Sequence, residues 1–121
     1  MFYITIDGDD IGQKITAAYL NNDIESLNRI NHLVYEKTHL IANYLSEQGF
    51  SIIFCAADGV AGFIDTLSIN ETSLFNEITN LVGNEISFSI GTGKSMRESY
   101  IALLAAKSNG KNQLFSYSNL N

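Results

Sequence analysis

The sequence predicts a single α+β domain over residues 1–121, built from an antiparallel sheet with helices packed against it. Short apolar runs that are typical of strands alternate with amphipathic segments that are typical of helices. An Asp-Gly pair separates two of the apolar runs, and this pair indicates a tight hairpin between antiparallel strands. The chain has 121 residues, 45% of them hydrophobic, and no proline, so one domain with a continuous core is expected.

The first half of the chain is predicted to begin with a strand that is followed by two helices. Residues 2–6 are rich in β-branched and aromatic side chains and end at a run of aspartates. A short helix is expected over 11–20. Residues 22–25 have the spacing of a capping box and start a long helix with an apolar period close to 3.6, which Gly49 ends.

The second half is predicted to contain a hairpin, two further helices and two further strands. The expected strands are 50–55, 60–64, 86–90 and 114–116, and the expected helices are 73–82 and the segment from Ser95 to Asn109. A second capping box, at 95–98, opens the last helix. This order contains the split βαββαβ arrangement of ferredoxin-like domains, with helices on one face of the sheet, an extra helix and a C-terminal strand.

Charge and cysteine content exclude several classes of protein. Thirteen acidic and seven basic residues give a net charge of −6, which argues against duplex nucleic acid as a partner. The single cysteine, Cys55, excludes an intramolecular disulfide and a cysteine-based zinc site. No apolar run reaches the roughly 18 residues of a membrane span, and no signal peptide is evident. A cytoplasmic location is therefore expected.

Four aspartates form the first candidate site. Asp7, Asp9 and Asp10 follow the first strand, and Asp58 lies at the hairpin tip. In the split βαββαβ order the first strand neighbours one hairpin strand, so these carboxylates meet at one edge of the sheet. Like charges this close repel unless a cation neutralises them, and hard oxygen ligands favour Mg²⁺ or Mn²⁺. The alternative is structural, with Asp9 or Asp10 capping the next helix and Asp58 only making the turn.

Basic residues gather near the C-terminus and form the second candidate site. Four of the seven are Lys94, Arg97, Lys107 and Lys111, with only one acid among them. Lys107 and Lys111 are four residues apart and straddle the end of the last helix. They either complement the helix dipole as solvated charges or hold phosphate groups opposite the acidic edge.

Four segments carry more specific motifs, and the last of them ends in Ala-Lys-x-x-Gly-Lys-Asn. The segments are YITIDGDDIG at 3–12, AADG at 56–59, IGTG at 90–93 and ALLAAKSNGKN at 102–112. Together they resemble the palm of the GGDEF and CRISPR Cas10 superfamily of nucleotide cyclases. The similarity is greatest to the minimal CRISPR polymerases (mCpol) of anti-phage defence, and it covers nearly the whole chain.

The resemblance implies a metal-dependent nucleotide enzyme and assigns roles to residues in these segments. The implied ligands of Mg²⁺ or Mn²⁺ are Asp7, the carbonyl of Gly8 and Asp58. The implied catalytic residues are Asp7, Asp10 and Asp58. The implied nucleotide-binding residues are Gly8, Asp9, Ile11, Gly12, Lys107, Lys111 and Asn112. Either Asp9 or Asp10 binds metal or ribose, and the sequence does not separate the two.

The implied activity is the synthesis of a cyclic dinucleotide or oligonucleotide, from ATP, as a signal in anti-phage defence. A 3′- or 2′-hydroxyl attacks an α-phosphate, and pyrophosphate leaves. One chain carries one site, so ring closure implies a homodimer with two sites face to face. By the same resemblance, the product acts on a separately encoded membrane effector. The base, the linkage, the ring size and the regulatory trigger stay open.

The hairpin departs from the pattern of the family. The family has Gly-Gly-acid-acid there, whereas this chain has Ala-Ala-Asp-Gly at 56–59 and lacks the second acid. One metal position is then weaker or uses Asp10. Two alternatives follow: a non-catalytic nucleotide sensor, motivated by Gly59, and a ring-opening enzyme like GTP cyclohydrolase III, which shares the string Gly-Asp-Asp-Ile-Gly.

Overall fold

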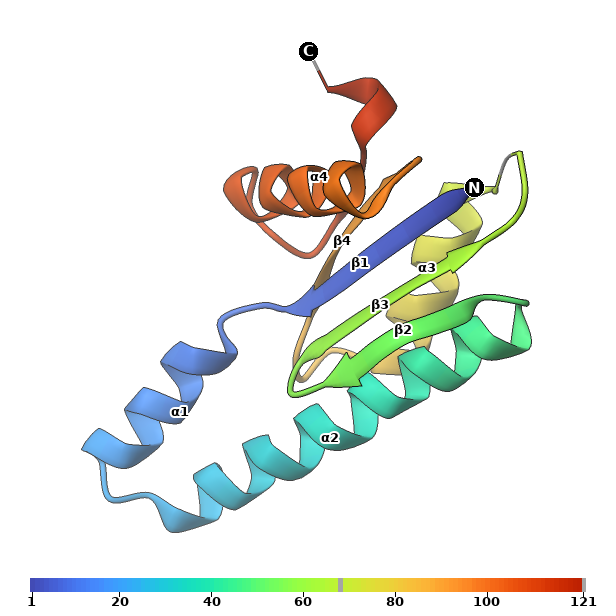
Figure 1. Cartoon of the computed structure of the whole chain (residues 1–121). Helices are drawn as coiled ribbons and strands as arrows, with labels where there is room; N and C mark the ends of the chain where they lie inside the picture. The colour runs from blue at the N-terminus through green and yellow to red at the C-terminus, as the bar shows by residue number, and fades with distance from the viewer. Residues whose placement is uncertain (68, 121) are drawn as a thin grey trace.

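The structure is a computed structural model that describes residues 1–67 and 69–120, so the predicted domain boundary at residue 121 lies outside it. Strands and helices follow one another in the predicted order (Figure 1). The described elements are β1 (Phe2–Gly8), α1 (Ile11–Leu20), α2 (Ile24–Glu47), β2 (Ser51–Ala56), β3 (Gly59–Ile64), α3 (Glu71–Val82), β4 (Phe88–Gly93), α4 (Met96–Ser108), β5 (Leu114–Ser116) and the 3₁₀ helix η1 (Tyr117–Asn119). None of the helices in this part of the chain is long and apolar enough to cross a membrane.

A sheet with strand order β2-β3-β1-β4-β5 forms the centre of the fold. β1 is antiparallel to both β3 and β4, and β2 is antiparallel to β3. The first four strands therefore have the split βαββαβ order that the sequence predicted. β5 differs because it pairs parallel with β4, and α4 supplies the crossover that a parallel pair requires.

Helices cover both faces of the sheet, whereas the sequence predicted them on one face. α2 and α3 cover the face that carries Ile6 and Ile90, which belong to the buried core. α4 lies along β1 and β4 on the other face (Figure 1). A Cβ at Gly91 would lie 2.1 Å from the backbone oxygen of Ser99 in α4, so this contact requires glycine. The inward side of α4 consists of small residues such as Ala102, so no strong apolar stripe marks this packing face.

Most predicted strand and helix boundaries shift by one to three residues in the structure, and contacts explain three of the differences. The strand predicted at 86–90 is β4 at 88–93, because its glycines pair with the central strand β1 although they carry no apolar signal. α2 is capped by Asp23, one residue later than the start of the predicted capping box. α3 begins earlier than predicted, because the side chain of Asn70 accepts a hydrogen bond from its first turn.

Three segments that are distant in sequence meet at one end of the sheet: the end of β1, the β2–β3 hairpin and the C-terminal end of α4 (Figure 1). The loop after β1 is anchored on two sides. Gly8 N donates a hydrogen bond to the backbone oxygen of Asp58 (3.0 Å), and Asp9 N donates one to that of Ser87 (2.9 Å). This end of the sheet carries the candidate site.

Candidate functional site

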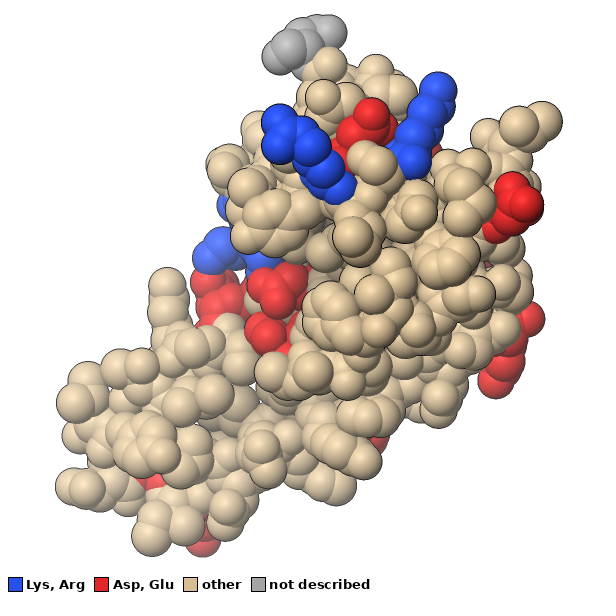
Figure 2. All heavy atoms as spheres, viewed as in Figure 1, with Lys and Arg blue, Asp and Glu red and all other residues tan. Residues whose placement is uncertain are grey.

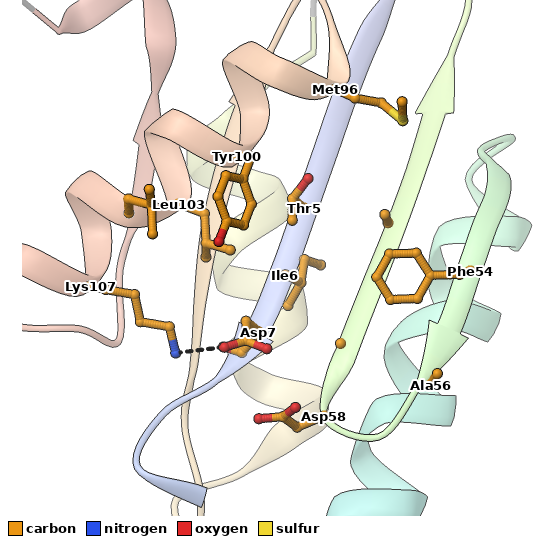
Figure 3. Close-up of a pocket in the computed structure, with 13 residues that line it drawn as sticks. Thr5, Ile6, Asp7, Phe54, Ala56, Asp58, Met96, Tyr100, Leu103 and Lys107 are labelled. Atoms are coloured by element: carbon orange, nitrogen blue, oxygen red, sulfur yellow. Dashed lines mark hydrogen bonds and ion pairs between the residues drawn. The ribbon is translucent and has the colours of Figure 1, made fainter. Parts of the chain in front are cut away.

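Asp7 and Asp58 lie side by side on neighbouring strands, as the sequence predicted. Asp7 pairs in register with Gly59, which places the hairpin tip next to the end of β1. Figure 3 shows the two carboxylates together, with Lys107 reaching Asp7 from α4. The Nζ of Lys107 lies 3.2 Å from Oδ2 of Asp7. The structure therefore brings residues from three motif segments to one place.

Asp9 is buried, and both of its carboxylate oxygens accept hydrogen bonds from other residues of the protein. Its Oδ1 accepts hydrogen bonds from Lys107 Nζ (2.8 Å) and Ser89 Oγ (2.7 Å). Its Oδ2 accepts from Ser87 Oγ (2.7 Å) and Asn112 N (2.9 Å). Burial pushes the pKa of Asp9 up, but hydrogen bonds from Lys107 and the two serines outweigh burial and hold the pKa below its ordinary value. Asp9 therefore ties β1 to β4, α4 and the loop after α4.

The two serines that bind Asp9 were not predicted as site residues. Ser87 and Ser89 belong to an alternating run that predicts a half-buried strand with its polar side toward solvent. In the structure Ser89 has no exposed surface. The alternation of apolar and polar residues was the only sequence signal for these serines. It could not show that Asp9, in the loop after β1, covers the polar side of the strand.

Asp10 precedes α1 but does not cap it with its side chain. Its backbone is left-handed (φ 60°), and its carboxylate forms an ion pair with Lys111. The hydrogen bond with Asp10 holds the pKa of Lys111 above its ordinary value, against a small opposing effect of burial. Asp10 therefore occupies the N-cap position predicted as an alternative, but neither its side chain nor that of Asp9 caps the helix.

Asp7 and Asp58 carry negative charge that the protein only partly offsets. Burial and the neighbouring charge of Asp58 raise the pKa of Asp7, although Lys107 acts in the opposite direction. The side chain of Asp7 is still 42% exposed, so a ligand can reach it. Among the ion pairs of residues 1–67 and 69–120, Lys107 contacts Asp7 and Asp9, Lys111 contacts Asp10, and none involves Asp58.

The donor set fits a hard divalent cation, with protein ligands limited to a few oxygens. Carboxylate oxygens suit Mg²⁺ or Mn²⁺ better than zinc. Across residues 1–67 and 69–120, no group of three or more His, Cys, Asp or Glu side chains has metal-binding geometry, so a metal at Asp7 and Asp58 would have at most two such side chains as ligands. The carbonyl of Gly8, also predicted as a ligand, accepts a hydrogen bond from Lys107 Nζ (2.7 Å).

The glycines and Ile11 of the β1–α1 loop have different roles. A Cβ at Gly8 would lie 2.8 Å from Cγ1 of Ile11 and 3.0 Å from Cβ of Asp58, so glycine allows the hairpin to approach. A Cβ at Gly12 would meet nothing within 4 Å, so the backbone there is open to a ligand. Ile11 belongs to the core, and only its backbone at the start of α1 is placed to bind an anion.

The basic segment divides into two separate groups. α4 has 13 residues, so its ends are about 18 Å apart. Lys94 and Arg97 lie at its N-terminal end, whereas Lys107 and Lys111 lie at or beyond its C-terminal end and contact the aspartates. Figure 2 shows basic side chains in two places on this face, one of them against a cluster of acidic side chains.

Left-handed backbone is concentrated around the site. The non-glycine residues with positive φ at the site are Asp10 (60°), Ala57 (51°), Lys111 (66°) and Asn112 (50°). Such a conformation costs roughly 1–2 kcal/mol for a residue with a Cβ, and residues held this way cluster at functional sites. The loop after α4 is held in this conformation by the contacts of Asn112 with Asp9 and of Lys111 with Asp10, and the hairpin is bonded to the end of β1 through Gly8 N and Asp58 O.

Replacing Ala57 by glycine is expected to raise the free energy of unfolding by about 0.5–1 kcal/mol, because glycine adopts φ 51° without the Cβ penalty. Urea unfolding followed by circular dichroism measures this change. The matched control is Ala17→Gly on an exposed position in α1, which should lower stability by about 1 kcal/mol. A loss of stability at residue 57 as well would contradict this account of the hairpin.

Comparisons with known proteins bear on this geometry. A family model described as the minimal CRISPR polymerase domain (mCpol) matches residues 3–117. The fold is similar to that of the GGDEF domain of DgcB from Caulobacter crescentus in complex with c-di-GMP (12% identity, TM-score 0.75, 98% of this chain and 78% of that chain). It is also similar to the GGDEF domain of TpbB, or YfiN, from Pseudomonas aeruginosa (13%, 0.63, 96% and 76%). No curated protein sequence matches the chain.

Proposed function

Because the chain belongs to the minimal CRISPR polymerase family and has a nucleotide-cyclase-type palm, we propose that it is a Mg²⁺-dependent nucleotidyltransferase that makes a cyclic dinucleotide from ATP. The observation that carries this proposal is the Asp7–Asp58 pair at the end of the central strand, with Lys107 beside Asp7 and Lys111 on the neighbouring Asp10. A polymerase-type reaction needs this combination of metal-binding carboxylates and phosphate-binding cations.

In the proposed reaction, the oxygen of a ribose 3′- or 2′-hydroxyl attacks the α-phosphorus of a triphosphate. The new P–O bond forms as the bond from the α-phosphorus to the pyrophosphate oxygen breaks, and the hydroxyl proton passes to solvent. A second such step closes the ring. When bound at Asp7 and Asp58, Mg²⁺ would make the hydroxyl more acidic and offset charge on the departing pyrophosphate.

The residues around this pair would bind and orient the triphosphate. Lys107 and Lys111 would hold the pyrophosphate, and the backbone N–H groups at the start of α1 would bind a phosphate. Without a ligand, Lys107 contacts Gly8 O and Asp9. Transfer of Lys107 to the phosphates would free the carbonyl of Gly8 as a metal ligand. Asp9, with both oxygens engaged, would position Lys107 and leave Asp10 as the aspartate nearer to the nucleotide.

Pyrophosphate release tests this function. Purified protein would be incubated with Mg²⁺ and each nucleoside triphosphate in turn, with EDTA in parallel samples. We expect pyrophosphate from ATP with Mg²⁺ and none with EDTA. Metal-dependent ATP binding without turnover would instead favour the sensor, which the missing acid at Gly59 motivates. Loss of imidazole absorbance from GTP would favour the ring-opening enzyme, and either outcome overturns the proposal.

Ring closure needs a second nucleotide, so the proposal includes a homodimer with two facing sites. Sedimentation velocity with and without ATP and Mg²⁺ measures this, and a dimer is expected at least with ligand. A monomer that still makes a cyclic product would overturn the dimer and leave the activity in place.

As in anti-phage systems of this kind, the product would act on a separately encoded membrane effector.

Replacing Lys111 by Gln is expected to raise the KM for ATP about 10- to 150-fold, because a charge-assisted hydrogen bond to phosphate contributes about 1.5–3 kcal/mol. The fold should be retained because Lys111 lies on the surface beyond α4. Steady-state kinetics measure the change. Lys94→Gln, at the other end of α4, is the matched control and should leave KM unchanged. Equal effects of the two variants would show that Lys111 contributes only general positive charge.

A further inference from the structure

A cleft of about 480 Å³ lies between α4 and the sheet, directly beside the candidate site. At one end it reaches Asp7, Asp58 and Lys107, and from there it runs along the sheet toward Met96 (Figure 3). Its volume falls within the usual range for small-molecule sites. The cleft is mainly apolar away from the charged end, so it suits a ligand that is apolar and flat on one side and polar on the other.

Aromatic side chains stand on both walls of the cleft. Phe54 lies on the β2 side of the cleft and Tyr100 on the α4 side, with β3 and β1 between them (Figure 3). Both side chains are about half exposed, although they are large and apolar. On the α4 wall, Met96, Tyr100 and Leu104 are four residues apart and lie on one helix face. The floor between the walls is made of small residues such as Ala61, which keep it flat.

A β-bulge aims Phe54 into the cleft. The pairing of β2 with β3 shifts between Ile52 and Phe54, so Phe54 pairs with Ala61. Without the extra residue, strand alternation would point the ring to the other face of the sheet. Bulges that re-aim a side chain are common next to active sites. The ring is therefore placed over the cleft by a specific feature of the backbone.

The order of residues along β1 places the cleft relative to the proposed reaction centre. Along this strand, Thr5 forms part of the cleft floor, Asp7 follows at the charged end, and the loop 8–12 comes after it. Of the two lysines proposed to hold the pyrophosphate, Lys107 lies at the charged end of the cleft, and Lys111, which contacts Asp10, lies beyond Asp7 from the cleft. In an in-line displacement, the attacking oxygen and the leaving oxygen lie on opposite sides of the phosphorus. The cleft is thus on the side from which the attacking hydroxyl must come.

We propose that this cleft binds the base and sugar of the acceptor nucleotide, with the base packed against the aromatic side chains of Phe54 and Tyr100. This inference rests on the proposed function, and in the proposed dimer it assigns to this face of the sheet the base and sugar of the nucleotide whose triphosphate the facing chain holds. Stacking on aromatic rings tolerates any base, because every base has a π face. The subsite should accept adenine and guanine with similar affinity, so base selectivity would come from the triphosphate-bearing nucleotide.

The test uses a nucleoside without phosphates, 2-aminopurine riboside, because its binding requires neither the metal nor the lysines. Its fluorescence is quenched when it stacks, so a titration gives its affinity. Phe54→Ala and Tyr100→Ala are expected to weaken binding roughly 5- to 150-fold, the range for loss of one base–aromatic stack. Tyr100→Phe should bind like the wild type. Tyr35→Ala is the matched control, because Tyr35 stacks on His39 in α2, outside the cleft.

The same preparations are assayed for pyrophosphate release, which separates failure of this inference from failure of the proposed function. If ATP is turned over but both alanine variants bind the nucleoside like the wild type, the subsite is overturned and the function stands. If no pyrophosphate forms but the alanine variants lose nucleoside binding, a base site exists and its role as acceptor site is overturned. If Phe54→Ala dissociates a dimer and leaves nucleoside binding unchanged, the cleft is an interface between copies, which also overturns the proposal.

Discussion

Replacing Asp7 by Asn is expected to abolish pyrophosphate release while making the protein more stable. Under the proposed function Asp7 and Asp58 hold the metal, and loss of metal stabilisation worth several kcal/mol would lower the rate on the order of 10³-fold or more. Stability should rise because burial and the charge of Asp58 disfavour the ionised form of Asp7. Lys107 keeps its contacts with Gly8 and Asp9 in this variant.

The stability gain should depend on pH in a defined direction. Because the pKa of Asp7 is raised above its ordinary value of 3.8, the folded protein binds this proton more tightly than the unfolded chain does. The contribution of Asp7 to stability is therefore present below pH 3.8 and is lost as the pH rises through the raised pKa. Asp7→Asn should then unfold at a higher temperature than the wild type at pH 7, but not in acid.

Asp65→Asn serves as the matched control, because Asp65 is exposed and follows β3 at the end away from the hairpin. It should change neither pyrophosphate release nor the melting temperature. If Asp7→Asn retained more than about a tenth of the wild-type rate, where the metal account requires a loss on the order of 10³-fold, the assignment of the metal site to the Asp7–Asp58 pair would be wrong.

Replacing Asp9 by Ala is expected to destabilise the fold by about 3 kcal/mol or more, the usual result of removing one partner from a buried charged network. Asp9 is 4% exposed, and the variant leaves Ser89 Oγ and the backbone N–H of Asn112 without this carboxylate. Lys107 would lose its shortest carboxylate contact. The melting temperature should fall by roughly 10 °C.

The contribution of Asp9 should be lost in acid, opposite to that of Asp7. The pKa of Asp9 lies below its ordinary value, so its stabilisation is fully present above pH 3.8 and disappears as the pH falls through the lowered pKa. Urea unfolding at pH 7 and at pH 3 tests both statements. Asp23→Ala, which removes the cap of α2, is the control and should cost only about 1 kcal/mol. A similar cost for Asp9→Ala would show that Asp9 does not connect the strands.

The element order was predictable because strong local signals mark each segment. Asp-Gly at the hairpin and the apolar stripe of α2 are properties of short windows, and the structure confirms both elements. The packing of α4 on the second face was not predictable, because it depends on Gly91 and on small residues that carry no hydrophobic signal. The parallel pairing of β5 likewise depends on a crossover that no local window contains.

The site residues that lie in contiguous motifs were predictable from the sequence. The contacts between residues far apart in the chain were not. Asp7, Asp58 and Lys107 lie in motif segments, and the structure brings them together. The burial of Asp9 depends on serines about 80 positions away, so the sequence could not separate its role from that of Asp10. Phe54 enters the cleft only through a bulge, although the spacing of Met96, Tyr100 and Leu104 already marks an apolar helix face.

Mass spectrometry of the product is the most direct test of the proposed activity. Purified protein would be incubated with ATP, Mg²⁺ and pyrophosphatase, with Asp7→Asn as the inactive control. We expect a species with the mass of two joined adenosine monophosphates less two waters, which resists phosphatase because the ring has no terminal phosphate. Recovery of intact ATP, or of products identical to those of Asp7→Asn, would contradict the proposal that the carboxylate pair at the end of β1 is a nucleotidyltransferase centre.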